Sequence, residues 1–286
     1  MRRLVPLLLL AIAMLRAPGV LAQTGVELRI DSLEPGVALP AYWFAAAAGA
    51  SPRPAVLALH GCGGLGSHAG RLGPDPLRYV QILNAAGIGV LFTESFVPRG
   101  ESSICSQKSH LRRITEEDRR LDVYGALNWL ARQPGVDAAR LAVVGWSHGG
   151  QTVLASADAS SALVRAAGVQ PAALVAFYPG CSKALNNAHY ALSAPTLIMS
   201  GALDNWTLAA YCRELGERLA QQAAGPALRY IEYPGSYHGF DSHLPPRELS
   251  GIGSTRSGRA MRGGNALARE ASARDMLAFL EAQFAK

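Results

Sequence analysis

The chain has 286 residues, 49% hydrophobic and only 17% charged, which is enough apolar sequence for a large core and excludes disorder for most of its length. The formal net charge is +6, yet no basic stripe with interleaved aromatic residues occurs, so the sequence does not indicate nucleic-acid binding.

Residues 1–22 resemble a secretory signal peptide. Arg2 and Arg3 precede an apolar run over residues 4–15, and small residues end the segment at Ala22. The run would span about 18 Å as a helix, too short for a membrane core of about 30 Å. An uncleaved anchor or a buried helix is the alternative. Removing Arg2, Arg3 and Arg16 lowers the net charge from +6 to +3. We therefore predict a secreted or periplasmic protein whose residues 23–286 form a single domain without a stable membrane anchor.

Short apolar runs recur along the mature chain and alternate, for the most part, with helix-like segments. Thr115 and Asp118 form a capping pattern ahead of a helical repeat that stops at Pro134, and further helices are expected over about 207–223 and 266–284. This alternation predicts a mainly parallel sheet with helices on both faces. A segment rich in Gly, Ser, Pro and Arg, residues 244–265, predicts a long surface loop. The predicted strands cover residues 55–59, 88–93, 141–144, 173–178, 196–200 and 228–233.

Two segments near the start of the predicted sheet carry candidate site residues. The first strand runs into the glycine-rich turn HGCGG at residues 60–64, where the Cys62 N–H could stabilise a negatively charged oxygen and His60 could order the turn. Arg99 follows the second strand, so it could pair with a substrate carboxylate, although a solvated arginine is the alternative.

The sequence GWSHG, residues 145–149, matches G-x-S-x-G and lies between a predicted strand and a predicted helix. In that context the motif indicates a nucleophile elbow, with Ser147 on a strained turn. The His148 N–H would then be the second oxyanion donor. Trp146 and Trp206 could line a pocket beside this serine, or simply pack.

A serine nucleophile needs a histidine base and an acid to orient it. Asp204 and His238 each lie in a loop just after a predicted strand, in the chain order serine, acid, histidine. Asp241 and His243 are the competing candidates and lie farther from their strand.

Four cysteines are present, and none forms a C-x-x-C pair or a zinc-site spacing, so no metal is predicted. Cys181 follows the fourth predicted strand and Cys212 lies on the helix after Asp204. Because neighbouring strands bring these segments together, we predict a disulfide between them. Pairing of Cys62 with Cys105 stays open.

The segments LHGCGG, ESFVPRG, GWSHGG, GALDNW and YHGFD, in this order, resemble the dienelactone hydrolase-like group of α/β-hydrolases over roughly residues 40–285. The resemblance implies the α/β-hydrolase fold, no cofactor, and hydrolysis of a carboxylic ester or lactone. The founding members use a cysteine nucleophile, whereas this chain has Ser147, so the resemblance does not fix the substrate.

Only about 17 residues separate the strands at 173–178 and 196–200, which is too short for a large cap domain. The site should therefore be open, which suits small-molecule esters or exposed polymer ends. We expect a serine hydrolase that works through an acyl-enzyme. The alternatives are an exported serine peptidase or amidase, and a catalytically inactive binding protein on the same fold.

Overall fold

The computed structural model describes residues 25–286 except for residues 48, 50–51, 67–71 and 223–224. The predicted signal peptide lies outside the described residues. Within them, no helix combines the length and apolar character that crossing a membrane would require.

The centre of the molecule is an eight-stranded sheet in the order β1-β2-β4-β3-β5-β6-β7-β8. Strands β3 to β8 all run parallel to one another, whereas β1 and β2 are antiparallel to each other and β2 is antiparallel to β4. This is the α/β-hydrolase fold, as expected from the sequence. The strands are β1 (Val26–Asp31), β2 (Ala38–Phe44), β3 (Arg53–Leu59), β4 (Gly89–Thr93), β5 (Val136–Trp146), β6 (Ala173–Phe177), β7 (Thr196–Gly201) and β8 (Leu228–Tyr233).

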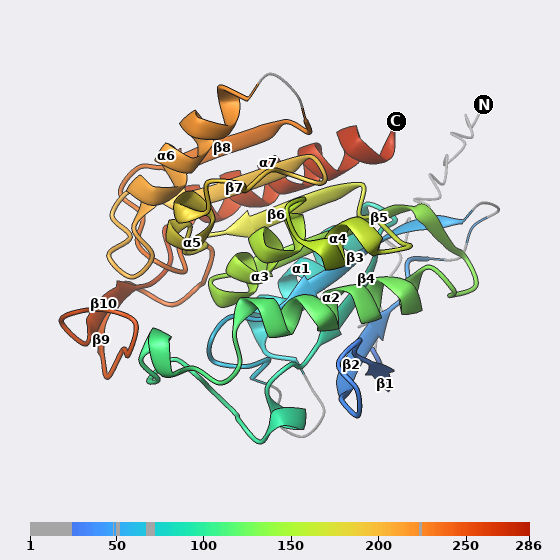
Figure 1. The fold of residues 1–286 in the computed structure, drawn as a ribbon, viewed down its shortest axis with the longest axis horizontal. Helices are drawn as coiled ribbons and strands as arrows, with labels where there is room; N and C mark the ends of the chain where they lie inside the picture. Colours follow the sequence, from blue (N-terminus) through green and yellow to red (C-terminus); the bar gives the residue numbers. More distant parts are fainter. Residues whose placement is uncertain (1–24, 48, 50–51, 67–71, 223–224) are drawn as a thin grey trace, which may run out of the picture.

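Helices cover both faces of the sheet (Figure 1). Successive residues of a strand point to opposite faces, so Leu57 joins the core beneath α2, α3 and α6, while Val56 joins the core beneath α1 and α7. Because both faces are buried, the central strands β4, β6 and β7 consist mostly of apolar residues. The helices are α1 (Pro74–Ala85), α2 (Glu116–Leu130), α3 (His148–Ala157), α4 (Ala162–Ala166), α5 (Ser182–Asn186), α6 (Ala209–Ala220) and α7 (Ala266–Phe284).

Helix α2 begins where the capping pattern predicted. The Thr115 hydroxyl accepts the Asp118 N–H, and the Asp118 carboxylate accepts the Thr115 N–H at 2.8 Å. Two donors that the helix leaves unpaired are thus satisfied.

The segment over residues 244–265 is not a loop throughout, so that prediction is wrong. It contains β9 (Arg247–Ser250) and β10 (Arg259–Arg262), which pair antiparallel in a separate two-stranded sheet. Arg262 also forms a bridge with His238, and the Gly263 N–H donates to the His238 carbonyl at 2.9 Å. The hairpin is therefore attached directly to the loop that follows β8.

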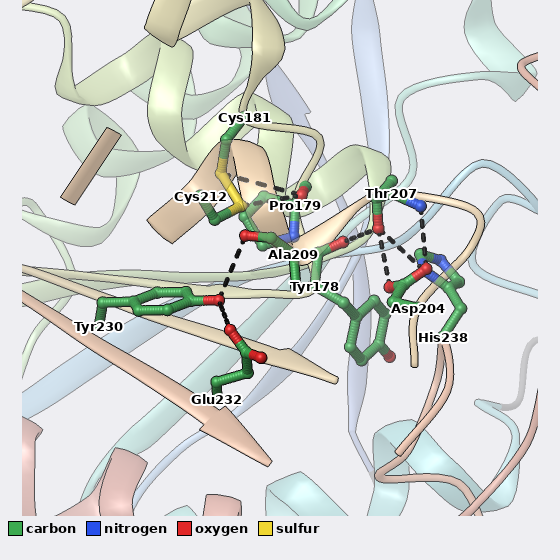
Figure 2. Close-up of a disulfide and its surroundings, with 10 residues drawn as sticks. All are labelled: Tyr178, Pro179, Cys181, Asp204, Thr207, Ala209, Cys212, Tyr230, Glu232 and His238. Atoms are coloured by element: carbon green, nitrogen blue, oxygen red, sulfur yellow. Dashed lines mark hydrogen bonds and ion pairs between the residues drawn. A yellow bond between two sulfur atoms is a disulfide. The ribbon is translucent and has the colours of Figure 1, made fainter. Parts of the chain in front are cut away.

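Two disulfides tie loops at the carboxyl end of the sheet. Cys181, just before α5, is bonded to Cys212 of α6 with a Cα–Cα distance of 5.0 Å, as predicted (Figure 2). Cys62 is bonded to Cys105, with a Cα–Cα distance of 4.9 Å, which settles the pairing that the sequence left open.

Candidate active site

The turn between β5 and α3 presents Ser147 in a backbone conformation that is rare for a residue with a side chain. Its φ is 55° and its ψ is −114°, which is strained for any L-residue. The neighbouring glycines permit the tight turn. A Cβ on Gly145 would lie 2.3 Å from the Gly149 carbonyl oxygen, and a Cβ on Gly149 would lie 2.3 Å from the Leu59 carbonyl oxygen. The motif GWSHG therefore forms the predicted elbow.

Three side chains from separate loops form a hydrogen-bonded chain that starts at Ser147. The Ser147 Oγ lies 2.9 Å from His238 Nε2, and His238 Nδ1 lies 2.8 Å from Asp204 Oδ2. Asp204 follows β7 and His238 follows β8, and both are buried, at 5% and 2% exposed. The loops that were predicted from strand ends and chain order are thus brought together at one edge of the sheet.

Asp204 is fixed by more than the histidine. Its Oδ1 accepts the backbone N–H groups of Trp206 at 2.8 Å and Thr207 at 2.9 Å, which leaves Oδ2 for His238. The Thr207 hydroxyl lies 2.9 Å from Asp204 Oδ2, 3.0 Å from the Tyr178 carbonyl oxygen and 3.1 Å from His238 Nδ1 (Figure 2). Thr207 therefore contacts both members of the acid–histidine pair, a role that the sequence analysis missed.

Two aromatic rings hold the imidazole of His238. The Trp206 ring is tilted by 34° against it with centroids 4.6 Å apart, and the Tyr178 ring meets it edge-on, also at 4.6 Å. Among the non-glycine residues that the structure describes, Tyr178 shares a positive φ with Ser147, and its φ is 38°. The ring of His238 is thereby restricted to the plane in which both nitrogens meet their partners.

The glycine-rich turn after β3 lies against the serine. A Cβ on Gly61 would be 3.4 Å from the Ser147 Cβ. Cys62 lines the same cavity as Ser147 and His148, and its carbonyl accepts the Ile104 N–H at 2.8 Å. The turn is held from behind by His60, whose Nδ1 lies 2.8 Å from the Gly61 carbonyl oxygen.

Glu94, at the end of β4, is a further support that the sequence did not reveal. Its carboxylate accepts the N–H groups of Leu65 at 2.6 Å and Phe96 at 2.7 Å, and lies 3.3 Å from His60. Burial opposes its ionisation, but His60 and the two amides outweigh that effect and lower the pKa of Glu94 to about 2. Glu94 is therefore an anion that fastens the glycine-rich turn to the end of β4.

The side chain of His148 points into the protein. Its Nδ1 lies 2.9 Å from the guanidinium of Arg119, which is fully buried and packs over the Phe96 ring at 5.1 Å. Burial, and then the charge of Arg119, hold the pKa of His148 well below its usual value. Burial also lowers the pKa of Arg119 to about 10. His148 is therefore a neutral acceptor, and only its backbone N–H remains for chemistry at the elbow.

The family model for the dienelactone hydrolase family matches residues 91–284, which include Ser147, Asp204 and His238. The chain belongs to the dienelactone hydrolase family. No curated protein sequence matches it.

Solved structures with this fold include proteins of several activities. A dienelactone hydrolase-like promiscuous phosphotriesterase from metagenomic libraries is 17% identical, with a TM-score of 0.65 over 91% of this chain and 99% of that one. Esterase 2 of Thermogutta terrifontis, phosphoramylated by tabun, is 16% identical, with a TM-score of 0.63 over 91% and 94%. The acylaminoacyl peptidase of Pyrococcus horikoshii is 14% identical, with a TM-score of 0.62 over 91% of this chain but 41% of that one. At these identities the likeness is one of fold.

Not every predicted residue of this family member faces the serine. Arg99 is bonded to Asp122 at 2.8 and 3.0 Å and to Glu34 at 3.0 Å, and its side chain is only 10% exposed. It lines neither described cavity that contains Ser147. Both interpretations from the sequence, a substrate contact and a solvated side chain, are therefore corrected to a structural ion pair that joins α2 to the segment after β1.

The two tryptophans and the competing acid differ in position. Trp206 lines both cavities that contain Ser147. Trp146 lines the smaller one, of about 270 Å³, and its ring is stacked on Phe177 with centroids 5.3 Å apart. Asp241 accepts bonds from Trp146 at 2.9 Å, Tyr79 at 2.7 Å and Tyr178 at 2.8 Å, not from His238. His243 is exposed, 3.4 Å from Asp75.

The described residues contain no cluster of three or more His, Cys, Asp or Glu side chains that could hold a metal ion.

Proposed function

We propose that this protein is a serine hydrolase that cleaves carboxylic esters or lactones through an acyl-enzyme. The observation that supports this most directly is the chain of hydrogen bonds from Asp204 through His238 to Ser147, with Ser147 on a strained elbow that faces an open cavity. A serine, a histidine and an acid in this geometry are the components of nucleophilic acyl transfer.

In the proposed mechanism, the Ser147 Oγ attacks the ester carbonyl while His238 Nε2 takes its proton. Asp204 holds the Nδ1–H tautomer and stabilises the imidazolium. The N–H groups of Cys62 and His148 stabilise the oxyanion, and each such donor typically contributes about 10² to 10³ in rate. His238 then gives the proton to the leaving alkoxide. In the second half of the reaction His238 takes a proton from water, the resulting hydroxide attacks the acyl carbonyl, and the Ser147 Oγ leaves and takes the proton back from His238. Every step uses groups of this chain.

Two disulfides support the further proposal that the protein works in an oxidising compartment, as a secreted or periplasmic enzyme. The same geometry could serve amide cleavage, so esters and anilides must be compared directly.

The test is a panel of p-nitrophenyl esters, simple lactones and p-nitroanilides, assayed on the wild type and on Ser147→Ala. Ser161→Ala, at the start of α4, is the matched control for a lost hydroxyl. We expect ester hydrolysis that Ser147→Ala lowers at least 10³-fold and Ser161→Ala leaves unchanged, with equal melting temperatures. Faster cleavage of anilides than of esters would make the protein a peptidase. No turnover of any substrate by the wild type would favour a binding protein.

A further inference from the structure

Among its described lining residues, the larger cavity beside Ser147 has positively charged side chains and no negatively charged ones. It encloses about 630 Å³, and its described lining includes two arginines, Arg112 and Arg256, but no aspartate or glutamate. Arg112 follows the short 3₁₀ helix Ser109–Leu111, and Arg256 lies at the tip of the β9–β10 hairpin. Two segments distant in the sequence therefore each contribute a cation to one cavity that reaches the reactive serine.

The guanidinium of Arg112 has no carboxylate bonded to it among the described residues. The side chain is half-buried, and its Nε is shielded from solvent without a hydrogen-bond partner. Burial lowers the pKa of Arg112, and the charge of Glu116 opposes this effect without cancelling it. Glu116 itself pairs with Lys183 at 3.3 Å. A partly desolvated cation without a bonded counter-charge is unfavourable. Arg99, by contrast, has two carboxylate partners.

Neutral hydrogen-bonding groups make up much of the remaining wall, which includes Ser109, Ser182, Gln151 and Asn205. The side-chain oxygen of Asn205 accepts the Met261 N–H at 2.8 Å, which leaves the side-chain NH₂ available to a ligand. The indole N–H of Trp206 donates to Ser254 at 2.9 Å, so the ring that borders the cavity is held in place. Most small-molecule pockets are mainly apolar. A wall of this kind is suited to a ligand with many hydroxyl groups.

We propose that this cavity binds the non-reacting part of the ester, and that this part is an acidic sugar whose carboxylate pairs with Arg112 and Arg256. The inference rests on the proposed esterase function and adds its substrate class. Guanidinium groups bind carboxylates through two parallel hydrogen bonds, while the hydroxyl and amide side chains match the sugar hydroxyls. The cavity volume falls within the range of about 300 to 1,000 Å³ typical of ligand pockets.

The test compares two acetyl esters that differ only in one carboxylate, O-acetylated galacturonic acid and O-acetylated galactose. Acetate release is measured for the wild type, Arg112→Gln, Arg256→Gln and the double variant. Arg247→Gln is the matched control, because Arg247 is exposed on the same hairpin but does not line the cavity. Hydrolysis of p-nitrophenyl acetate by every variant reports whether the fold and the reacting groups are intact.

We expect the wild type to favour the acidic ester at least tenfold in kcat/KM. Each cavity variant should lose most of that preference through KM, with little change on the neutral ester or on p-nitrophenyl acetate, and Arg247→Gln should match the wild type. Three outcomes would overturn this inference and leave the esterase proposal standing. They are equal rates on the two sugar esters, a preference for the acidic ester that survives in the double variant, and hydrolysis of p-nitrophenyl acetate without cleavage of either sugar ester. If the wild type does not hydrolyse p-nitrophenyl esters at all, the proposed function itself is overturned.

Discussion

Replacing Asp204 by asparagine should change the tautomer of His238 and little else. The asparagine Oδ1 can still accept the N–H groups of Trp206 and Thr207, so the loop should keep its shape. At the position of Oδ2, however, an NH₂ group would face His238 Nδ1, which is 2.8 Å away. The imidazole must then carry its proton on Nε2 and cannot accept the proton of Ser147.

The expected loss in kcat is roughly 10⁴-fold, or about 5 kcal/mol of activation free energy. The free energy of unfolding should fall by only about 1 to 2 kcal/mol, since the two hydrogen bonds from backbone N–H groups to the side chain remain. Hydrolysis of p-nitrophenyl acetate and urea unfolding measure the two effects separately. The double variant with Ser147→Ala should be no slower than Ser147→Ala alone, because the residues act as a unit.

The matched control is Asp241→Asn, which removes the other buried carboxylate near His238. Asp241 supports Tyr79, Tyr178 and Trp146, so its loss should cost about 1 to 3 kcal/mol of stability while kcat stays within tenfold. If Asp204→Asn kept near-normal kcat and Asp241→Asn lost it without unfolding, the assignment of the acid would be refuted.

Three other outcomes follow from contacts described above. Thr207→Val, which keeps the side-chain shape but not the hydroxyl, should lower kcat about 10- to 100-fold, whereas Thr207→Ser should retain most activity; equal kinetics for both would exclude a positioning role. The folded pKa of Glu94 is about 2, below the ordinary 4.5, so its ionisation stabilises the fold by up to about 3 kcal/mol above pH 4.5. This contribution is lost as the pH falls towards 2. The difference in unfolding free energy between wild type and Glu94→Gln, measured by urea unfolding, should therefore shrink over that interval, and a constant difference would contradict the argument. Replacing Cys181 and Cys212 by alanine should lower the free energy of unfolding by about 3 to 4 kcal/mol for a 31-residue separation, as thermal or urea unfolding would show; an unchanged value would mean that the bridge constrains nothing in the unfolded chain.

The parallel part of the sheet could be predicted because its strands are buried on both faces. Strands β4, β6 and β7 are buried along their whole length and mostly apolar, and each predicted range differs from the observed strand by at most one residue at an end. The β1–β2 pair was missed for the opposite reason. Most of β1 is exposed, and β2 is placed by pairing with the distant β4, where Ala41 lies opposite Thr93. Such pairing has no local sequence signal.

The hairpin formed by β9 and β10 was missed in the same way, because its strands are short, half of their residues are charged, and most of them are not buried. Its glycines and serines indicated a loop, and only the partner strand made the segment extended.

At the site, the order of loops along the chain was enough to predict Ser147, Asp204 and His238 as neighbours. Their supporting residues could not be found that way. Glu94 and Arg119 act through contacts with segments far along the chain, and a lone carboxylate or arginine in a sequence does not reveal its partner. Arg99 shows the converse, since a cation placed after a strand end turned out to be neutralised inside the protein.

The bridge between Cys62 and Cys105 makes the structure around Ser147 depend on the redox conditions that surround the chain. It fastens the glycine-rich turn to a segment whose Cys105 carbonyl in turn accepts the Gly253 N–H of the hairpin at 3.0 Å, so one covalent bond fixes three stretches of chain around the serine. A newly made chain in a reducing cytosol would lack that bond. The stretches of chain around Ser147 would then be joined by noncovalent contacts alone until the bond forms.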